Sequence, residues 1–87
     1  MERERAAFVC IHVFAGSRSI RLVAHEDGDW QFLCGEGHAP GDEPRVVGLK
    51  HLAERDSSIV EVLDLRQGWE AERHDVGEPW ARRQMGG

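Results

Sequence analysis

The stretch AFVCIHVFAGSRSIRLVAHEDGDWQFLC, residues 7–34, decides the fold. It contains three runs rich in β-branched and aromatic residues, 7–14, 19–24 and 30–34, which is the composition of β-strands. A short turn separates the first two runs, and residues 25–29, with an Asp-Gly turn signal, separate the last two. The stretch therefore predicts a three-stranded antiparallel meander.

One register gives this meander a wholly apolar face. The first turn pairs Val13 with Ile20, and the second loop pairs Ala24 with Trp30. Side chains alternate along a strand, so a slip by one residue would destroy the pattern. The apolar face then holds Val9, Ile11, Val13, Ile20, Leu22, Ala24, Trp30, Phe32 and Cys34, with Ile11, Leu22 and Phe32 in one cross-strand row. The opposite, mixed face holds Phe8, Cys10, His12, Phe14, Ser19, Arg21, Val23, Gln31 and Leu33.

The second half of the chain supplies the cover for the apolar face. Residues 49–65 form the amphipathic stretch, which predicts helical structure broken near Asp56. Its inward side chains are Leu49, Leu52, Ile59, Val62 and Leu63. Ser58 and Glu61 have the spacing of a capping box, so the second helix is expected to begin at Ser58.

Two further strands are expected around these helices. Val46 and Val47 predict a short strand after a Gly- and Pro-rich loop, and residues 69–74 predict a late one. The whole chain, 1–87, is expected to be a single α+β domain, an antiparallel meander packed against one or two short helices. Residues 1–6 and 83–87 are expected to be frayed.

Composition excludes several classes of protein. The chain has 87 residues, of which 40% are hydrophobic and 31% charged, so it fits one globular core and no second one. No segment reaches the ~18 apolar residues that a membrane span needs, and no signal peptide is recognisable, so we expect a cytoplasmic protein. The net charge of −5 argues against nucleic acid as a partner and is compatible with a basic protein partner.

Two cysteines and two histidines form the ligand set of a structural zinc site: Cys10, His12, Cys34 and His38. In the predicted meander, however, Cys34 lies on the apolar face, whereas Cys10 and His12 lie on the opposite face. Strand 19–24 also separates them. We therefore predict two free thiols on opposite faces, with no metal and no cofactor.

Catalytic machinery is not recognisable in the sequence. Cys10 and His12 would project in parallel from one strand about 6.8 Å apart, beyond hydrogen-bonding reach. No Gly-rich phosphate loop appears either. We therefore expect no enzyme and no catalytic residue.

Several segments resemble a known group of proteins. They are Gly28 to Gly35 (GDWQFLCG), Val47-Gly48-Leu49 and Gly68 to Arg73 (GWEAER). This pattern resembles small uncharacterised bacterial proteins and is similar to a domain of unknown function assigned to immunity proteins of toxin systems. The resemblance implies an inhibitor that covers a protein partner, and it assigns no functional residue.

We expect a non-enzymatic protein-binding module, immunity-like in inhibiting a basic partner; the alternative is a small zinc protein that uses the four ligands named above. The expected binding residues are the mixed-face residues Phe8, His12, Phe14, Arg21 and Leu33, the acidic loop residues Asp42 and Glu43, and Trp80. A competing interpretation has Trp69 and Trp80 lying over Phe8 and Phe14, which would make this face part of the core.

Overall fold

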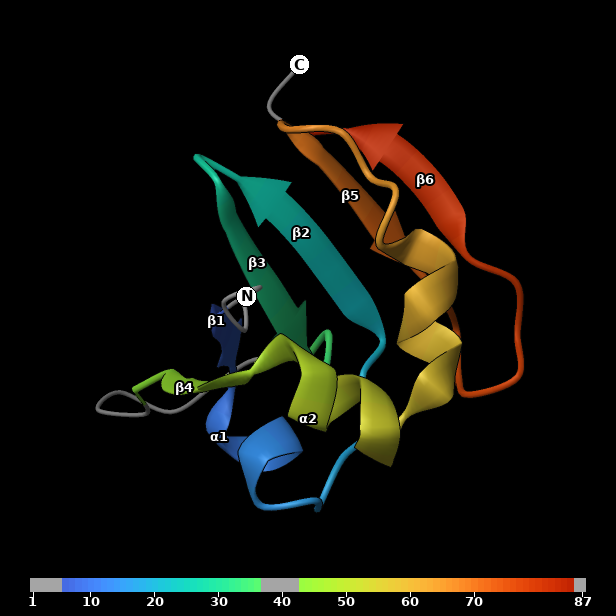
Figure 1. Cartoon of the computed structure of the whole chain (residues 1–87). Helices are drawn as coiled ribbons and strands as arrows, with labels where there is room; N and C mark the ends of the chain where they lie inside the picture. The colour runs from blue at the N-terminus through green and yellow to red at the C-terminus, as the bar shows by residue number, and fades with distance from the viewer. Residues whose placement is uncertain (1–5, 37–42, 86–87) are drawn as a thin grey trace.

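Two short strands that are distant in the sequence lie side by side and in parallel at the centre of the molecule. In the computed structural model, which describes residues 6–36 and 43–85, strand β1 pairs with β3 in parallel, with Val9 opposite Phe32. The described elements are β1 (Ala6–Val9), α1 (Ile11–Phe14), β2 (Leu22–Glu26), β3 (Asp29–Leu33), β4 (Arg45–Gly48), α2 (Leu49–Arg55), the 3-10 helix η1 (Ser57–Val62), β5 (Trp69–Glu72) and β6 (Ala81–Gln84) (Figure 1).

The strands form one six-stranded sheet in the order β4-β1-β3-β2-β5-β6. Every neighbouring pair except β1–β3 is antiparallel. The predicted α+β class is therefore confirmed. The strand predicted over 46–47 is β4, and the predicted late strand is β5. None of the described helices has the length and apolarity that crossing a bilayer requires.

The predicted meander is wrong in its first strand. The strand β1 covers only Ala6–Val9, and Ile11–Phe14 turns into the short helix α1 beyond the ends of β1 and β3 (Figure 1). Periodicity cannot separate a strand from a buried helical turn in so short an apolar run. Because the chain turns at α1, β3 inserts between β1 and β2, and the predicted pairing of the first run with 19–24 does not form.

The β2–β3 hairpin forms as predicted, but its register is shifted by one residue. The observed turn has only two residues, Asp27 and Gly28, with φ of 53° and 82°, as a type I′ turn requires. Glu26 therefore pairs with Asp29, and Val23 pairs with Phe32. Consequently Val23 shares the core face with Phe32, and Leu22, which the sequence analysis placed there, lies on the other face.

Gly28 allows this tight turn to form without backbone strain, since an L side chain at φ of 82° is strained. We expect Gly28→Ala to lower the free energy of unfolding by about 1–2 kcal/mol. Space is not the cause, because an added Cβ would have Gln67 Nε2 as its nearest neighbour at 3.9 Å. Urea unfolding would measure the change. Gly28→Asn is the control, because asparagine tolerates the left-handed region, and an equal loss in both variants would argue against the backbone explanation.

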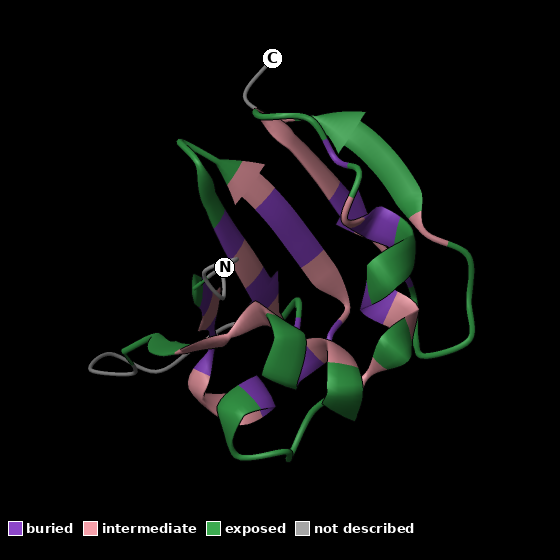
Figure 2. Cartoon of the chain, in the orientation of Figure 1, coloured by how far each residue is buried: buried purple, intermediate pink, exposed green. Residues whose placement is uncertain are grey.

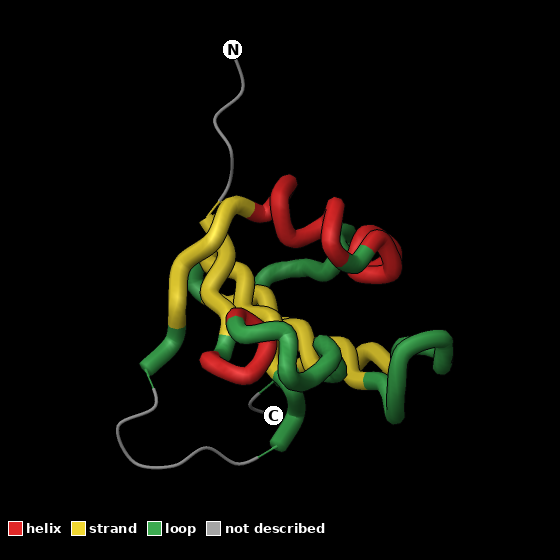
Figure 3. Tube along the Cα trace, turned by 90° about the horizontal axis from the view of Figure 1, so that it is seen from below, coloured by secondary structure: helices red, strands yellow, loops and turns green. Residues whose placement is uncertain are grey.

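Helices α2 and η1 lie together on one side of the strands (Figures 1 and 3) and cover the core face of the sheet. Figure 2 shows the buried residues in the middle of β2 and β3 and within η1. The buried apolar core consists of Ala7, Val9, Cys10, Val13, Ile20, Val23, Trp30, Phe32, Cys34, Leu52, Ile59, Val62, Leu65 and Ala71.

The predicted helical segment is confirmed, including its break near Asp56. Leu52, Ile59 and Val62 are buried, and Leu49 and Leu63 pack against the core cluster from partly exposed positions. The cap differs from the prediction. Asp56, rather than Ser58, is the N-cap of η1, and its carboxylate accepts a hydrogen bond from the Ser58 backbone N–H at 3.1 Å.

The C-terminal part is more ordered than expected. Residues 81–84 form strand β6, which pairs with β5, so residues 83 and 84 are not frayed. Arg83 contributes to this edge, because its guanidinium donates to Glu70 at 2.8 Å and to Glu72 at 3.0 Å. These cross-strand ion pairs lie on an exposed strand, where they contribute to register more than to stability.

Candidate functional site

The face of the sheet turned away from α2 and η1 carries a partly exposed apolar patch. We call it the back face and define it by Phe8, Gln31, Leu33 and Val46. Phe8 pairs with Gln31 on β3 and with Val46 on β4, so these side chains form one row across three strands. Phe8 and Leu33 are half-buried, and Val46 is 60% exposed. Apolar side chains that stay partly exposed in such a row lose part of the stabilisation that full burial would give.

A hollow of about 370 Å³ lies on this back face beside α1. Its walls combine apolar side chains with an acidic rim. They are formed by Phe8, Cys10, Ile11, Asp29, Gln31, Leu33, Glu43 and Pro44. Three of the residues expected to bind a partner, Phe8, Leu33 and Glu43, are therefore brought together.

The other expected binding residues that the structure describes lie outside the hollow. Phe14 is 46% exposed on α1, with the Arg45 guanidinium 5.7 Å from its ring centroid. Arg21 is 3.6 Å from the Glu36 carboxylate. Asp42 falls outside the described residues.

The two late tryptophans are packing residues. Trp69 and Trp80 both pack against the core cluster, and the Arg73 guanidinium lies 4.2 Å from the Trp80 ring centroid. They do not cover Phe14, which is exposed. The interpretation that these tryptophans bury the mixed face is therefore wrong.

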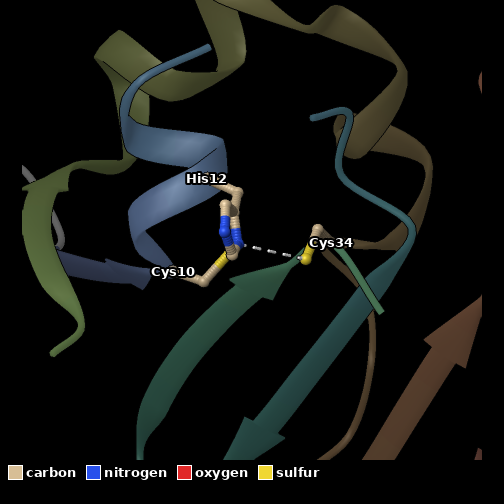
Figure 4. Close-up of side chains that lie close together, drawn as sticks. All are labelled: Cys10, His12 and Cys34. Carbon is tan, nitrogen blue, oxygen red and sulfur yellow. Dashed lines mark hydrogen bonds between the residues drawn. The ribbon is translucent and has the colours of Figure 1, made fainter. Parts of the chain in front are cut away.

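His12 belongs to a second feature, a cluster of Cys10, His12 and Cys34 that we call the thiol cluster (Figure 4). One donor atom from each side chain lies within 4.8 Å of the other two. The Cys34 Sγ and the His12 Nδ1 are 3.8 Å apart. Both cysteines are buried and neither forms a disulfide, and His12 is partly exposed.

Topology explains how these residues meet. Parallel neighbouring strands end at the same edge of a sheet, so Cys10, directly after β1, lies beside Cys34, directly after β3. The first turn of α1 then brings the His12 imidazole close to both sulfur atoms (Figure 4). The predicted placement of the two thiols on opposite faces, separated by a strand, is wrong because β1 and β3 are adjacent.

Arg18 and Glu36 border the thiol cluster. The Arg18 Nη1 is 3.8 Å from the Cys34 Sγ, 3.4 Å from the His12 Nδ1 and 3.1 Å from the Glu36 carboxylate. The surroundings are therefore cationic on the side of Arg18, and Glu36 holds that cation in place.

The pKa of the Cys34 thiol lies below its ordinary value. Burial raises this pKa, but hydrogen bonding to the backbone at Glu36, and then to Arg18 and Cys10, outweighs burial. The hydrogen bond to Cys34 in turn raises the pKa of Arg18. Thiolate is the form in which cysteine ligates metals and acts as a nucleophile.

Sequence reasoning missed one structural centre, the buried Arg73. Its side chain is 1% exposed and pairs with Asp56 at 3.2 Å. A motif could not have revealed the pair, because its two members are separated by 17 residues and an intervening helix and strand.

Comparison with known proteins adds no relative. No family model, no curated protein and no solved structure matches the chain. The geometry of the back face and of the thiol cluster therefore carries the functional argument.

Proposed function

We propose that this chain is a non-enzymatic protein-binding domain that docks a basic partner protein on its back face. The observation that carries the proposal is the hollow in which Phe8 and Leu33 form the apolar floor and Asp29 and Glu43 the acidic rim. An aromatic residue in a depression, with polar groups around it, is the usual arrangement of a binding hot spot.

Charge favours a basic partner. The chain carries a net charge of −5, and the hollow is lined by two acidic residues, Asp29 and Glu43, and by no basic residue among those described. Such a surface accelerates encounter with a positively charged protein, and salt weakens this effect. The same charge disfavours nucleic acid as the ligand, because phosphates require a basic surface.

An inhibitory role agrees with these features. A small acidic domain that covers the working surface of a basic enzyme, such as a nuclease, needs shape and charge complementarity and no catalytic group of its own. Two cysteines that form no disulfide fit a reducing compartment, so we place this activity in the cytoplasm.

The test is affinity capture from the host with the immobilised chain, followed by affinity measurement with the purified captured protein. We expect a basic protein that binds more weakly as salt rises. Phe8→Ser should weaken its binding about 30-fold or more, as expected for a hot-spot residue.

Phe14→Ser is the matched control, because Phe14 is an exposed phenylalanine outside the hollow. It should retain the partner, and circular dichroism should show both variants folded. Failure of the wild-type chain to retain any protein at low salt, or equal binding by Phe8→Ser and wild type, would contradict the proposal.

A further inference from the structure

The thiol cluster shares Cys10 with the wall of the hollow, but its chemistry points to a different ligand. We infer that Cys10, His12 and Cys34 form a binding site for a thiophilic divalent cation, with Zn²⁺ as the favoured ion. Two sulfur donors and one imidazole nitrogen are the ligands that zinc takes in protein sites. The inferred metal binding does not require the proposed partner binding, although the two sites share Cys10.

The distances fit a tetrahedral ion after a small contraction. With Zn–S near 2.3 Å and Zn–N near 2.0–2.1 Å, donor atoms of one tetrahedral ion lie roughly 3.3–3.8 Å apart. The Cys34 Sγ and the His12 Nδ1 are already 3.8 Å apart, and all three donors lie within 4.8 Å of one another. Rotation about side-chain bonds of His12 and Cys10 would supply the remaining approach of about 1 Å.

The backbone positions these donors before any ion arrives. Cys10 and Cys34 follow adjacent parallel strands, and the Cys10 N–H donates to the Phe32 carbonyl at 3.4 Å. His12 is held in α1, whose Val13 is buried in the core. A site with ligands on structured elements loses little conformational entropy on binding, so affinity is higher than for the same residues on a mobile chain.

Burial distinguishes this cluster from a chance grouping of surface residues. Cys10 is 5% exposed and Cys34 is 1% exposed. Carboxylates that gather on a surface often hold no ion, whereas here two of the three metal donors, the sulfur atoms, belong to buried residues. The ion would tie β1, α1 and β3 together just beyond the ends of the two strands, which is a structural role.

The Arg18 guanidinium would compete with a metal ion for the donor atoms of the thiol cluster. Its guanidinium contacts both the Cys34 Sγ and the His12 Nδ1, two of the three donors. The Arg18 side chain is 41% exposed, so it can swing toward solvent while remaining near Glu36. Binding of the divalent ion therefore displaces the Arg18 guanidinium from these donors and releases the thiol protons of Cys10 and Cys34 to solvent, and removal of Arg18 should favour the metal.

The test begins with the reduced, chelator-treated wild-type chain titrated with Co²⁺, whose thiolate complexes have characteristic visible and near-ultraviolet absorption. We expect saturation at one ion per chain, displacement of Co²⁺ by Zn²⁺, and a higher Tm with Zn²⁺ present. Absence of thiolate-to-cobalt absorption in the wild-type chain would overturn the inference without recourse to any variant. Ready conversion of both thiols to a Cys10–Cys34 disulfide, with no metal retained under reducing conditions, would also overturn it.

Variants then assign the ligands. Cys34→Ser, Cys10→Ser and His12→Ala should each weaken Zn²⁺ binding more than 100-fold, which exceeds the 10–100-fold loss typical of groups that only support a ligand. Arg18→Gln should bind Zn²⁺ severalfold more tightly. His51→Ala, an exposed histidine on α2, is the matched control and should bind as the wild type does. Unchanged affinity in Cys34→Ser, with the fold intact by circular dichroism, would remove the cluster as the site.

Discussion

Replacing Asp56 by alanine is expected to lower the free energy of unfolding by about 3–5 kcal/mol, because it leaves a buried cation without its partner. The cation is Arg73, whose side chain is 1% exposed. Its Nη2 donates to the Asp56 carboxylate at 3.2 Å, its Nη1 to the Ser58 hydroxyl at 2.7 Å and its Nε to the Ile20 carbonyl at 3.0 Å. Two neutral acceptors remain after the substitution, and neither supplies a negative charge.

Asp56 contributes a second interaction that the same substitution removes. Its carboxylate caps η1 by accepting from the Ser58 backbone N–H and from the Ser58 hydroxyl. Loss of such a cap typically costs about 1 kcal/mol. The position therefore joins the end of β5 to the start of η1, and both elements line the core.

Asp64→Ala is the matched control, since Asp64 also pairs with an arginine, Arg82, but on the surface. The Asp64 side chain is 72% exposed, so its variant should keep nearly the wild-type urea midpoint. Urea unfolding at neutral pH, followed by circular dichroism, measures both variants. Similar midpoints for Asp56→Ala and Asp64→Ala would show that the Arg73 charge finds other compensation.

The sequence predicted the elements better than their arrangement. The Asp27-Gly28 turn, the strands around it and the helical stretch broken at Asp56 all follow from local signals, namely turn chemistry and apolar periodicity. The register was also accessible, because a two-residue turn fixes Glu26 opposite Asp29. Treating residues 25–29 as a longer loop shifted every pair by one.

The position of β3 between β1 and β2 was not accessible from local signals. The apolar run over 7–14 satisfies a single long strand as well as a short strand followed by a helical turn, and only tertiary packing selects the second. The same difference in strand order decides whether the residues of the thiol cluster meet. With β1 beside β2, Cys10 and Cys34 are separated by a strand, whereas with β1 parallel to β3 they meet.

The same substitution, phenylalanine to alanine, is expected to have different effects on the two faces of the sheet, at Phe32 on the core face and at Phe8 on the back face. Phe32 is fully buried, between Val9 on β1 and Val23 on β2, with the Trp30 ring centroid 6.2 Å away. Its truncation leaves a cavity beneath α2 and η1, and the expected loss in free energy of unfolding is about 3–5 kcal/mol. Against the stability of about 5–15 kcal/mol that is typical of a small domain, this is a large fraction.

Phe8 lies on the neighbouring strand but points to the back face, where its side chain remains partly exposed. Its truncation should cost much less stability, because less apolar area returns to water and no enclosed cavity forms. The loss should instead appear in affinity for the basic partner, which Phe32→Ala should change only through unfolding. Urea midpoints and partner binding measured on both variants separate these effects. If Phe8→Ala destabilised the chain as strongly as Phe32→Ala, the back face would be a second core face, and the docking proposal would lose its structural basis.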